Sequence, residues 1–189
     1  MDNGNGGSFV SKAGYTVPNL MPYYTAKGLT RGLTYRFRYR AKNVNGWGAL
    51  SSEVSILAAD APDAPPVPKM TTVSSTQLKL QLFPSTDNGG AVVTNYHLYM
   101  NTGVSGSVLS EVTDYVFSTE GFAYTLVYAD EAMTNGLYYQ FCATAENTIG
   151  ESECSSIVTF PTSDVPTTPN APTKIEDESD ETSIAVEWD

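Results

Sequence analysis

An alternation of apolar and polar residues, rather than a helical period, runs through the chain. Between Tyr35 and Ala41, apolar or small side chains alternate with basic ones, and the pattern then breaks at Asn43 and Gly46. Alternation of this kind is typical of a half-buried β-strand, and Asn and Gly favour turns. The segment therefore predicts a strand that enters a hairpin.

The same pattern returns further along the chain. The residues Tyr35, Phe37, Ala41, Asn43 and Gly46 recur 104 positions later as Tyr139, Phe141, Ala145, Asn147 and Gly150. An internal repeat of about 100 residues has the size of one small β-sandwich. We expect alternate residues of both copies to lie in a core, namely Tyr35, Phe37, Tyr39, Ala41, Tyr139, Phe141, Ala143 and Ala145.

Two proline-rich segments divide the chain, at residues 60–68 and 165–172. A new alternating strand is expected after each of them, at 78–82 and at 184–188. Because proline restricts the backbone to extended conformations, these segments predict domain junctions. The predicted domains are residues 1–60, the last part of one repeat; 61–163, a complete repeat; and 164–189, the first two strands of a third.

The start of the chain matches the middle of a repeat. Residues 1–4 resemble residues 100–103, which places Met1 at the end of a strand. In this frame we expect the chain to be part of a longer protein. It is either the repeating unit of a longer polymer or a piece whose limits are those of the ordered part of that protein.

These residues resemble fibronectin type III domains across essentially the whole chain. Leu29 lies six residues before Tyr35, as in the tyrosine corner of that family, and Trp188 matches its core tryptophan. Residues 84–90 and 96–98 are similar to the family's B–C loop and strand C. The resemblance implies an all-β fold of tandem immunoglobulin-like (fibronectin type III) β-sandwiches, with Trp188 in a core. In the middle repeat Leu82 stands at the tryptophan position.

Composition narrows the classes of partner. The chain has 21 acidic and 10 basic residues and a net charge of −11, so phosphate backbones and anionic lipid surfaces would repel it. It has no apolar run of about 18 residues, the length that a membrane-spanning helix needs. We therefore expect neither nucleic-acid binding nor direct membrane insertion.

The residues needed for hydrolytic catalysis are scarce. The chain has one histidine, His97, and two cysteines, and its acidic run at 176–181 lacks the spacing of a known calcium loop. His97 is expected to face outward as a surface residue, and a pair with Cys142 is the alternative. The sequence predicts a non-catalytic protein with no metal and no cofactor.

Cys142 and Cys154 flank the expected Asn147 turn on two neighbouring strands, at positions that can lie opposite one another. This placement fits a cross-strand disulfide, and the alternative is two free thiols. Their counterparts in the first repeat, Arg38 and Leu50, cannot form a bridge.

A stripe of basic residues is expected on one face of the first strand, because Arg36, Arg38, Arg40 and Lys42 alternate strictly. The stripe is either a binding surface for an acidic segment or an anionic glycan, or a solvated sheet face that discourages aggregation. Trp47, at the hairpin tip, is either a ligand anchor or a wedge against the next domain.

These features predict a structural function, in which the protein places or spaces other components. Serial sandwiches joined by short proline linkers predict a semi-rigid rod in an extracellular or cell-surface filament or coat. Its partners would be neighbouring repeats and other copies or proteins of the filament. The alternatives are a receptor-like recognition module for a protein or anionic glycan, and an intracellular cytoskeletal array.

Overall fold

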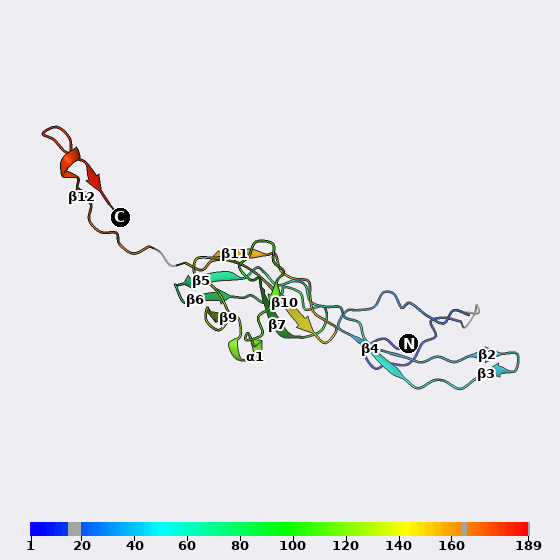
Figure 1. The fold of residues 1–189 in the computed structure, drawn as a ribbon. Coiled ribbons are helices and arrows are strands. Elements are labelled where there is room, and N and C mark those ends of the chain that lie inside the picture. The colour runs from blue at the N-terminus through cyan, green and yellow to red at the C-terminus, as the bar shows by residue number, and fades with distance from the viewer. Residues whose placement is uncertain (15–19, 164–165, 189) are drawn as a thin grey trace.

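The computed structural model describes residues 1–14, 20–163 and 166–188, and three parts follow one another along an elongated molecule (Figure 1). The predicted start of the third part, at Asp164, lies outside the described residues. The middle part carries most of the secondary structure. Its elements are β5 (Lys69–Val73), β6 (Gln77–Gln81), β7 (Val93–Met100), β8 (Ser110–Glu111), α1 (Phe117–Glu120), β9 (Ala123–Val127), β10 (Tyr138–Asn147) and β11 (Val158–Pro161).

The middle part is a sandwich of two antiparallel sheets. One sheet has the order β5-β6-β9, and the other has the order β11-β10-β7-β8. In the second sheet, Tyr96 pairs with Ala145 and Leu98 with Ala143, so that these inward residues stack across β7 and β10. The predicted all-β sandwich class is confirmed.

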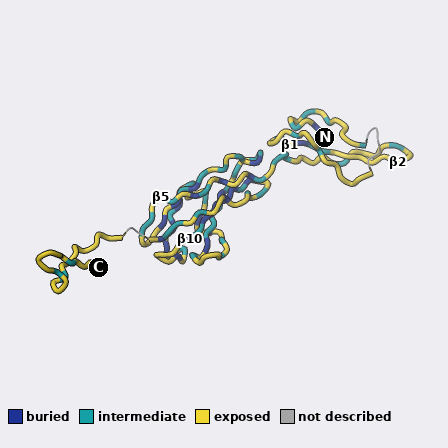
Figure 2. Tube along the Cα trace, turned by 90° about the horizontal axis from the view of Figure 1, so that it is seen from above, coloured by how far each residue is buried: buried dark blue, intermediate teal, exposed yellow. Residues whose placement is uncertain are grey.

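Alternate residues of the two sheets form one hydrophobic core. Leu78 and Leu80 of β6, and Leu82 just after it, are 0–1% exposed because they lie in one core cluster with Phe141 and its neighbours on β10. Figure 2 shows this buried band along the middle part. Tyr139, Phe141, Ala143 and Ala145 all lie in the core.

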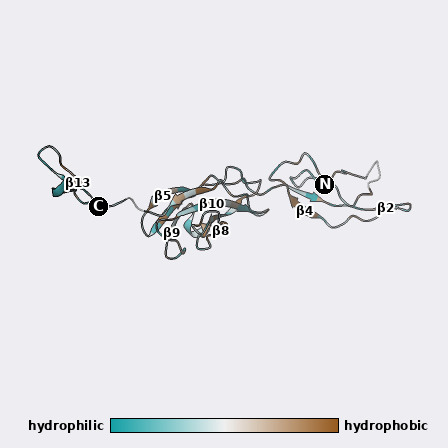
Figure 3. Cartoon of the chain, turned by 45° about the horizontal axis from the view of Figure 1, so that its top comes forward, coloured by the Kyte–Doolittle hydropathy of each residue, from teal (hydrophilic) through white to brown (hydrophobic). Residues whose placement is uncertain are grey.

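Among its described residues, the first part contains two separate two-stranded sheets. β1 (Thr34–Phe37) pairs with β4 (Val54–Leu57), and β2 (Lys42–Asn43) with β3 (Gly46–Trp47). Tyr35 is 5% exposed, but Phe37 is only half-buried and Ala41 is exposed. The prediction that Phe37, Tyr39 and Ala41 lie in a core is therefore wrong for this chain, because no second sheet among the described residues covers their face. The same uncovered face exposes Tyr39 and the apolar side of β4, coloured brown in Figure 3.

The last part is a short hairpin of β12 (Thr173–Lys174) and β13 (Val186–Glu187), with the 3-10 turn η1 (Glu176–Glu178) between them. Trp188 is 72% exposed. The expectation of a core tryptophan is wrong here for the same reason, since no opposing sheet lies on this hairpin among the described residues.

Two pairs of equivalent hydrogen bonds show that the first and middle parts have the same local structure at positions 104 residues apart or nearly so. The Tyr35 hydroxyl accepts a hydrogen bond from Thr30 N at 2.8 Å, and the Tyr139 hydroxyl accepts one from Thr134 N at 2.7 Å. This is the tyrosine-corner arrangement that the sequence predicts. Asp2 and Asn101 likewise accept from the backbone N–H that follows each tyrosine, both at 2.9 Å.

Candidate functional site

The linker between the first and middle parts lies along the loop 84–90 of the middle sandwich. Asp60 N donates to Gly89 O at 2.8 Å, and Asp63 N donates to Asp87 O at 3.0 Å. The Ser85 hydroxyl donates to Asp63 O at 2.6 Å. The linker backbone is thus bonded to the domain that follows it.

Three prolines of this linker are buried. Pro62, Pro65 and Pro68 are all buried, at a spacing of three residues. Proline favours the polyproline II conformation, which has three residues per turn, so such a spacing places the three rings on one side. The linker therefore has buried rings as well as a hydrogen-bonded backbone.

Asn147, the last residue of β10, ties the linker to two loops. Its Nδ2 donates to Asp60 O at 2.8 Å and to Asn88 O at 2.9 Å. Its Oδ1 accepts from Ile149 N at 2.8 Å and from Gly150 N at 3.1 Å, which closes the hairpin turn. With all four bonds made and 4% exposure, Asn147 fixes the turn and the linker together.

Gly89 is required at this junction for two reasons. Its φ of +75° is unfavourable for other residues, and a Cβ would lie 2.0 Å from Asp60 O. The loop can approach the linker this closely only because residue 89 has no side chain.

An exposed ion pair adds a contact from the first part. Arg31 Nη1 lies 2.6 Å from Asp87 Oδ2. The hydrogen bond from Arg31, together with one from Gly89 N, lowers the pKa of Asp87. Because both side chains are almost half exposed, this pair contributes orientation more than stability.

The basic stripe, Arg36, Arg38, Arg40 and Lys42, is ordered by two aromatic rings. The Arg38 guanidinium lies 3.8 Å from the centroid of the Phe9 ring, and the Arg40 guanidinium lies 4.6 Å from that of Trp47. Lys42 Nζ is 5.3 Å from the same indole. Cation–π contact of this kind restricts the long side chains without neutralising them.

Arg36 differs from the rest of the stripe because it is part of an internal ion pair. Its Nε lies 2.8 Å from Asp2 Oδ2, and Asp2 is 2% exposed. Hydrogen bonds from the backbone and side chain of Arg36 lower the pKa of Asp2 to about 2. Arg36 therefore holds the start of the chain on β1.

Trp47 does not wedge against the next domain. Figure 1 places β2 and β3 at the end of the first part that is far from β10. The wedge prediction fails because the junction forms where β1 begins and β4 ends, whereas the Trp47 hairpin lies at the opposite end of the strands.

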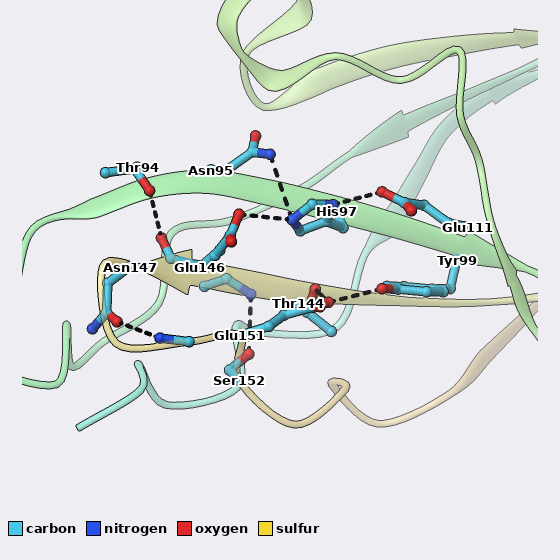
Figure 4. A network of polar contacts seen from close by, with 12 residues as sticks. Thr94, Asn95, His97, Tyr99, Glu111, Thr144, Glu146, Asn147, Glu151 and Ser152 are labelled. Atoms are coloured by element: carbon cyan, nitrogen blue, oxygen red, sulfur yellow. Dashed lines mark hydrogen bonds and ion pairs between the residues drawn. The ribbon is translucent and has the colours of Figure 1, made fainter.

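Three carboxylates surround His97 on the outer face of the β7–β10 sheet. His97 Nδ1 lies 2.6 Å from Glu111 Oε1, and Nε2 lies 3.3 Å from Glu146 Oε2 (Figure 4). Glu151 accepts hydrogen bonds from the hydroxyls of Tyr99, at 2.8 Å, and Thr144. We call Glu111, Glu146 and Glu151 the acidic face.

His97 is not the ordinary exposed residue that the sequence predicts. Its side chain is 18% exposed, and it lies opposite Thr144, whereas Cys142 lies opposite Tyr99. Burial lowers the pKa of His97, but the hydrogen bonds to Glu111 and Glu146 outweigh burial, so the net shift is upward.

Cys142 and Cys154 are joined in a disulfide, with 5.8 Å between their Cα atoms. The bond fastens β10 to the segment before β11. Cys142 is 3% exposed, so the bridge lies against the sheet.

In the parts of the chain that the structure describes, no three His, Cys, Asp or Glu side chains are grouped so as to hold a metal ion. None of the helices in the described ranges is long and apolar enough to cross a bilayer.

Sequence reasoning missed the junction residues and the partners of His97. The Asn88-Gly89-Gly90 run signals a turn, but its contact with Asp60 joins residues distant in sequence. Similarly, Glu111 reaches His97 only because β8 pairs with β7.

No protein-family model matches the chain, but known proteins are similar to it in sequence over most of its length. Endoglucanase B of Cellulomonas fimi is 30% identical over 158 residues, which cover 79% of this chain and 14% of that protein. Fibronectin type-III domain-containing protein 3A of Mus musculus is 28% identical over 169 residues, 87% of this chain and 13% of that protein. Drosophila melanogaster titin is 27% identical over 169 residues, 88% of this chain and 1% of titin.

The chain is made of tandem fibronectin type III repeats. A crystal structure of titin domains has the same fold, with a TM-score of 0.51 and 24% identity over 72% of this chain and 44% of that one. The present chain spans 14% or less of the length of each of these three relatives.

Proposed function

We propose that the chain is a non-catalytic spacer, a rod of fibronectin type III repeats whose docked linker fixes the orientation of one repeat on the next. The observation that carries this proposal is the bonding of Asp60 and Asp63 to the loop 87–89 of the following sandwich. Function then lies in the distance and direction that the rod imposes on whatever its ends carry.

The physical argument compares this junction with a flexible linker. A flexible linker keeps its backbone solvated, and repeats joined by it reorient freely. Here the linker donates two backbone hydrogen bonds, accepts a bond from Asn147, and buries three proline rings. Reorientation would have to break several of these contacts at once.

We place the rod outside the cell or at its surface. The support is the Cys142–Cys154 bond, since disulfides persist in oxidising compartments and are rare in the cytosol.

The experiment that tests the spacer measures the angular spread across the junction. Spin labels are attached to Ser55→Cys on β4 and Lys79→Cys on β6, both exposed positions, and the distance between them is measured by pulsed electron paramagnetic resonance. We expect a narrow distribution for the native junction. In Gly89→Ala the distribution should broaden, because the added Cβ displaces Asp60 from the loop.

Gly106→Ala is the matched control. Gly106 has a similar φ of +78° but nothing within 4 Å of an added Cβ, so it carries the backbone strain without the junction contact. A broad distribution in the native chain would refute the spacer.

A recognition module is the second candidate, favoured by the stacking of Arg38, Arg40 and Lys42 on aromatic rings. A ligand would then meet cations that are already ordered. Titration with heparin, an anionic glycan, tests this candidate, and Arg38→Glu with Arg40→Glu should abolish the binding.

A further inference from the structure

The outer faces of the two repeats differ in charge: the first is basic, the second is acidic, and Lys42 and Glu146 are of opposite sign at equivalent positions. Residues 38, 40 and 42 are Arg, Arg and Lys, whereas their counterparts 142, 144 and 146 are Cys, Thr and Glu. Glu111 and Glu151 extend the negative charge of the middle repeat on either side of Glu146. The basic stripe and the acidic face thus lie on equivalent surfaces of successive repeats.

Three cations of the stripe are ordered but uncompensated. Arg36 pairs with Asp2, but Arg38, Arg40 and Lys42 form no ion pair within the described residues. Their contacts with Phe9 and Trp47 restrict the side chains before any partner arrives. The entropic cost of ordering them on binding is correspondingly small.

The acidic face presents three carboxylates that are also held in place. Glu111 and Glu146 contact His97, and Glu151 accepts from Tyr99. The side chains of Glu111 and Glu146 remain 46% and 42% exposed. His97, the one basic group among them, compensates at most one of the three negative charges.

We propose that the basic stripe of one copy of this chain docks on the acidic face of a second copy. Three uncompensated cations would meet three carboxylates, of which His97 compensates at most one. The spacings are also compatible, since alternate residues on a strand are about 6.8 Å apart and adjacent strands about 4.8 Å apart. Long Arg and Lys side chains can span this difference.

A second copy of the chain is the proposed partner because every copy carries both the basic stripe and the acidic face. The stripe runs away from the middle repeat, so it does not meet the acidic face of its own chain (Figure 1). Each copy offers one face of each sign, and two antiparallel copies can therefore make the contact twice. The rods of the proposed spacer would associate side by side through this contact, although the contact does not require the junction to be rigid.

Sedimentation velocity of the whole chain tests the proposal. We expect self-association at about 20 mM salt that weakens at least about tenfold at about 500 mM, because exposed charges are screened. Arg38→Glu with Arg40→Glu should abolish association, as should Glu111→Lys with Glu146→Lys. Lys69→Glu with Lys79→Glu, the same charge change on the other sheet, should not.

A mixture of the two reversed variants is the decisive sample. Each variant alone has two faces of like sign, but together they restore attraction at both contacts, so the mixture should associate as the native chain does. Recovery in the mixture also shows that the variants are folded.

Three results would overturn the proposal: a native chain that stays monomeric at low salt, association that persists in Arg38→Glu with Arg40→Glu, or a mixture that stays monomeric. Persistent association would point to the uncovered apolar face of β1 and β4 instead. Since the spin-label distances are measured within one copy, their failure and the failure of this proposal are separate outcomes.

Discussion

Replacing Asn147 by Asp separates the two tasks of this side chain. The Oδ1 atom can still accept from Ile149 N and Gly150 N, so the turn keeps its hydrogen bonds. The bonds from Nδ2 to Asp60 O and Asn88 O are lost, and a carboxylate oxygen faces the two carbonyl oxygens instead. The change therefore acts on the junction while sparing the hairpin.

The magnitude follows from those two bonds. A buried hydrogen bond contributes about 1 kcal/mol net, so losing two costs about 2 kcal/mol, and two unsatisfied carbonyl groups beside a buried charge cost about 1–2 kcal/mol more. We expect the free energy of unfolding of the middle repeat to fall by about 3–4 kcal/mol. The distance distribution across the junction should broaden in parallel.

Urea denaturation followed by far-UV circular dichroism measures the loss, and Asn43→Asp is the matched control. Asn43 occupies the equivalent turn, but among the described residues its side chain makes one hydrogen bond, accepted from Asn45 N at 2.9 Å in an exposed hairpin. An aspartate accepts the same bond, so the expected change is below about 0.5 kcal/mol. An equally small change in Asn147→Asp would refute the junction energetics.

Three further predictions concern the charged groups and the disulfide. Reducing the Cys142–Cys154 bond, which spans 12 residues, should lower the free energy of unfolding by about 2–3 kcal/mol, measured as the shift in urea midpoint with and without reductant. No shift should occur in a variant with serine at both positions. The pKa of Asp2 is lowered to about 2, so its contribution to stability is present above about pH 3.9 and disappears as the pH falls towards 2; Asp2→Asn should remove this part of the acid transition in a urea series. The pKa of His97 is raised, so its contribution is present below about pH 6.5 and is lost as the pH rises through the folded-state pKa. An NMR titration of the imidazole should show the raised pKa, and Glu111→Gln should lower it; an unchanged value would contradict the pairing.

Much of the fold could be predicted from local pattern. The strands around Tyr139 and the two tyrosine corners depend on alternation and on short-range spacing, which the sequence displays directly. The burial of Phe37, Ala41 and Trp188 could not, because burial requires a second layer. The repeat shows which face each residue presents, but it does not supply the sheet that covers that face.

The candidate site was less predictable because its contacts join distant segments. Asn147 lies 87 residues from Asp60, and nothing local to either position indicates the contact. The same applies to His97, whose partners Glu111 and Glu146 come from the strands on either side of β7. For the Asn147 contact, the signal in the sequence was the glycine pair beside Asn88, which permits a close backbone approach but does not name the segment that approaches.

The two repeats also show which positions the fold leaves free. Tyr35 and Tyr139 are the same residue and are buried alike, because the corner needs a ring inside and a hydroxyl at the backbone. One residue further on, Arg36 and Gln140 differ, and the divergence grows to opposite charge at Lys42 and Glu146. Packing constrains the inward residues, whereas an outward residue can change sign without disturbing the core. The outward face of this strand is therefore where a fibronectin type III array can acquire contacts between rods while each sandwich keeps its fold.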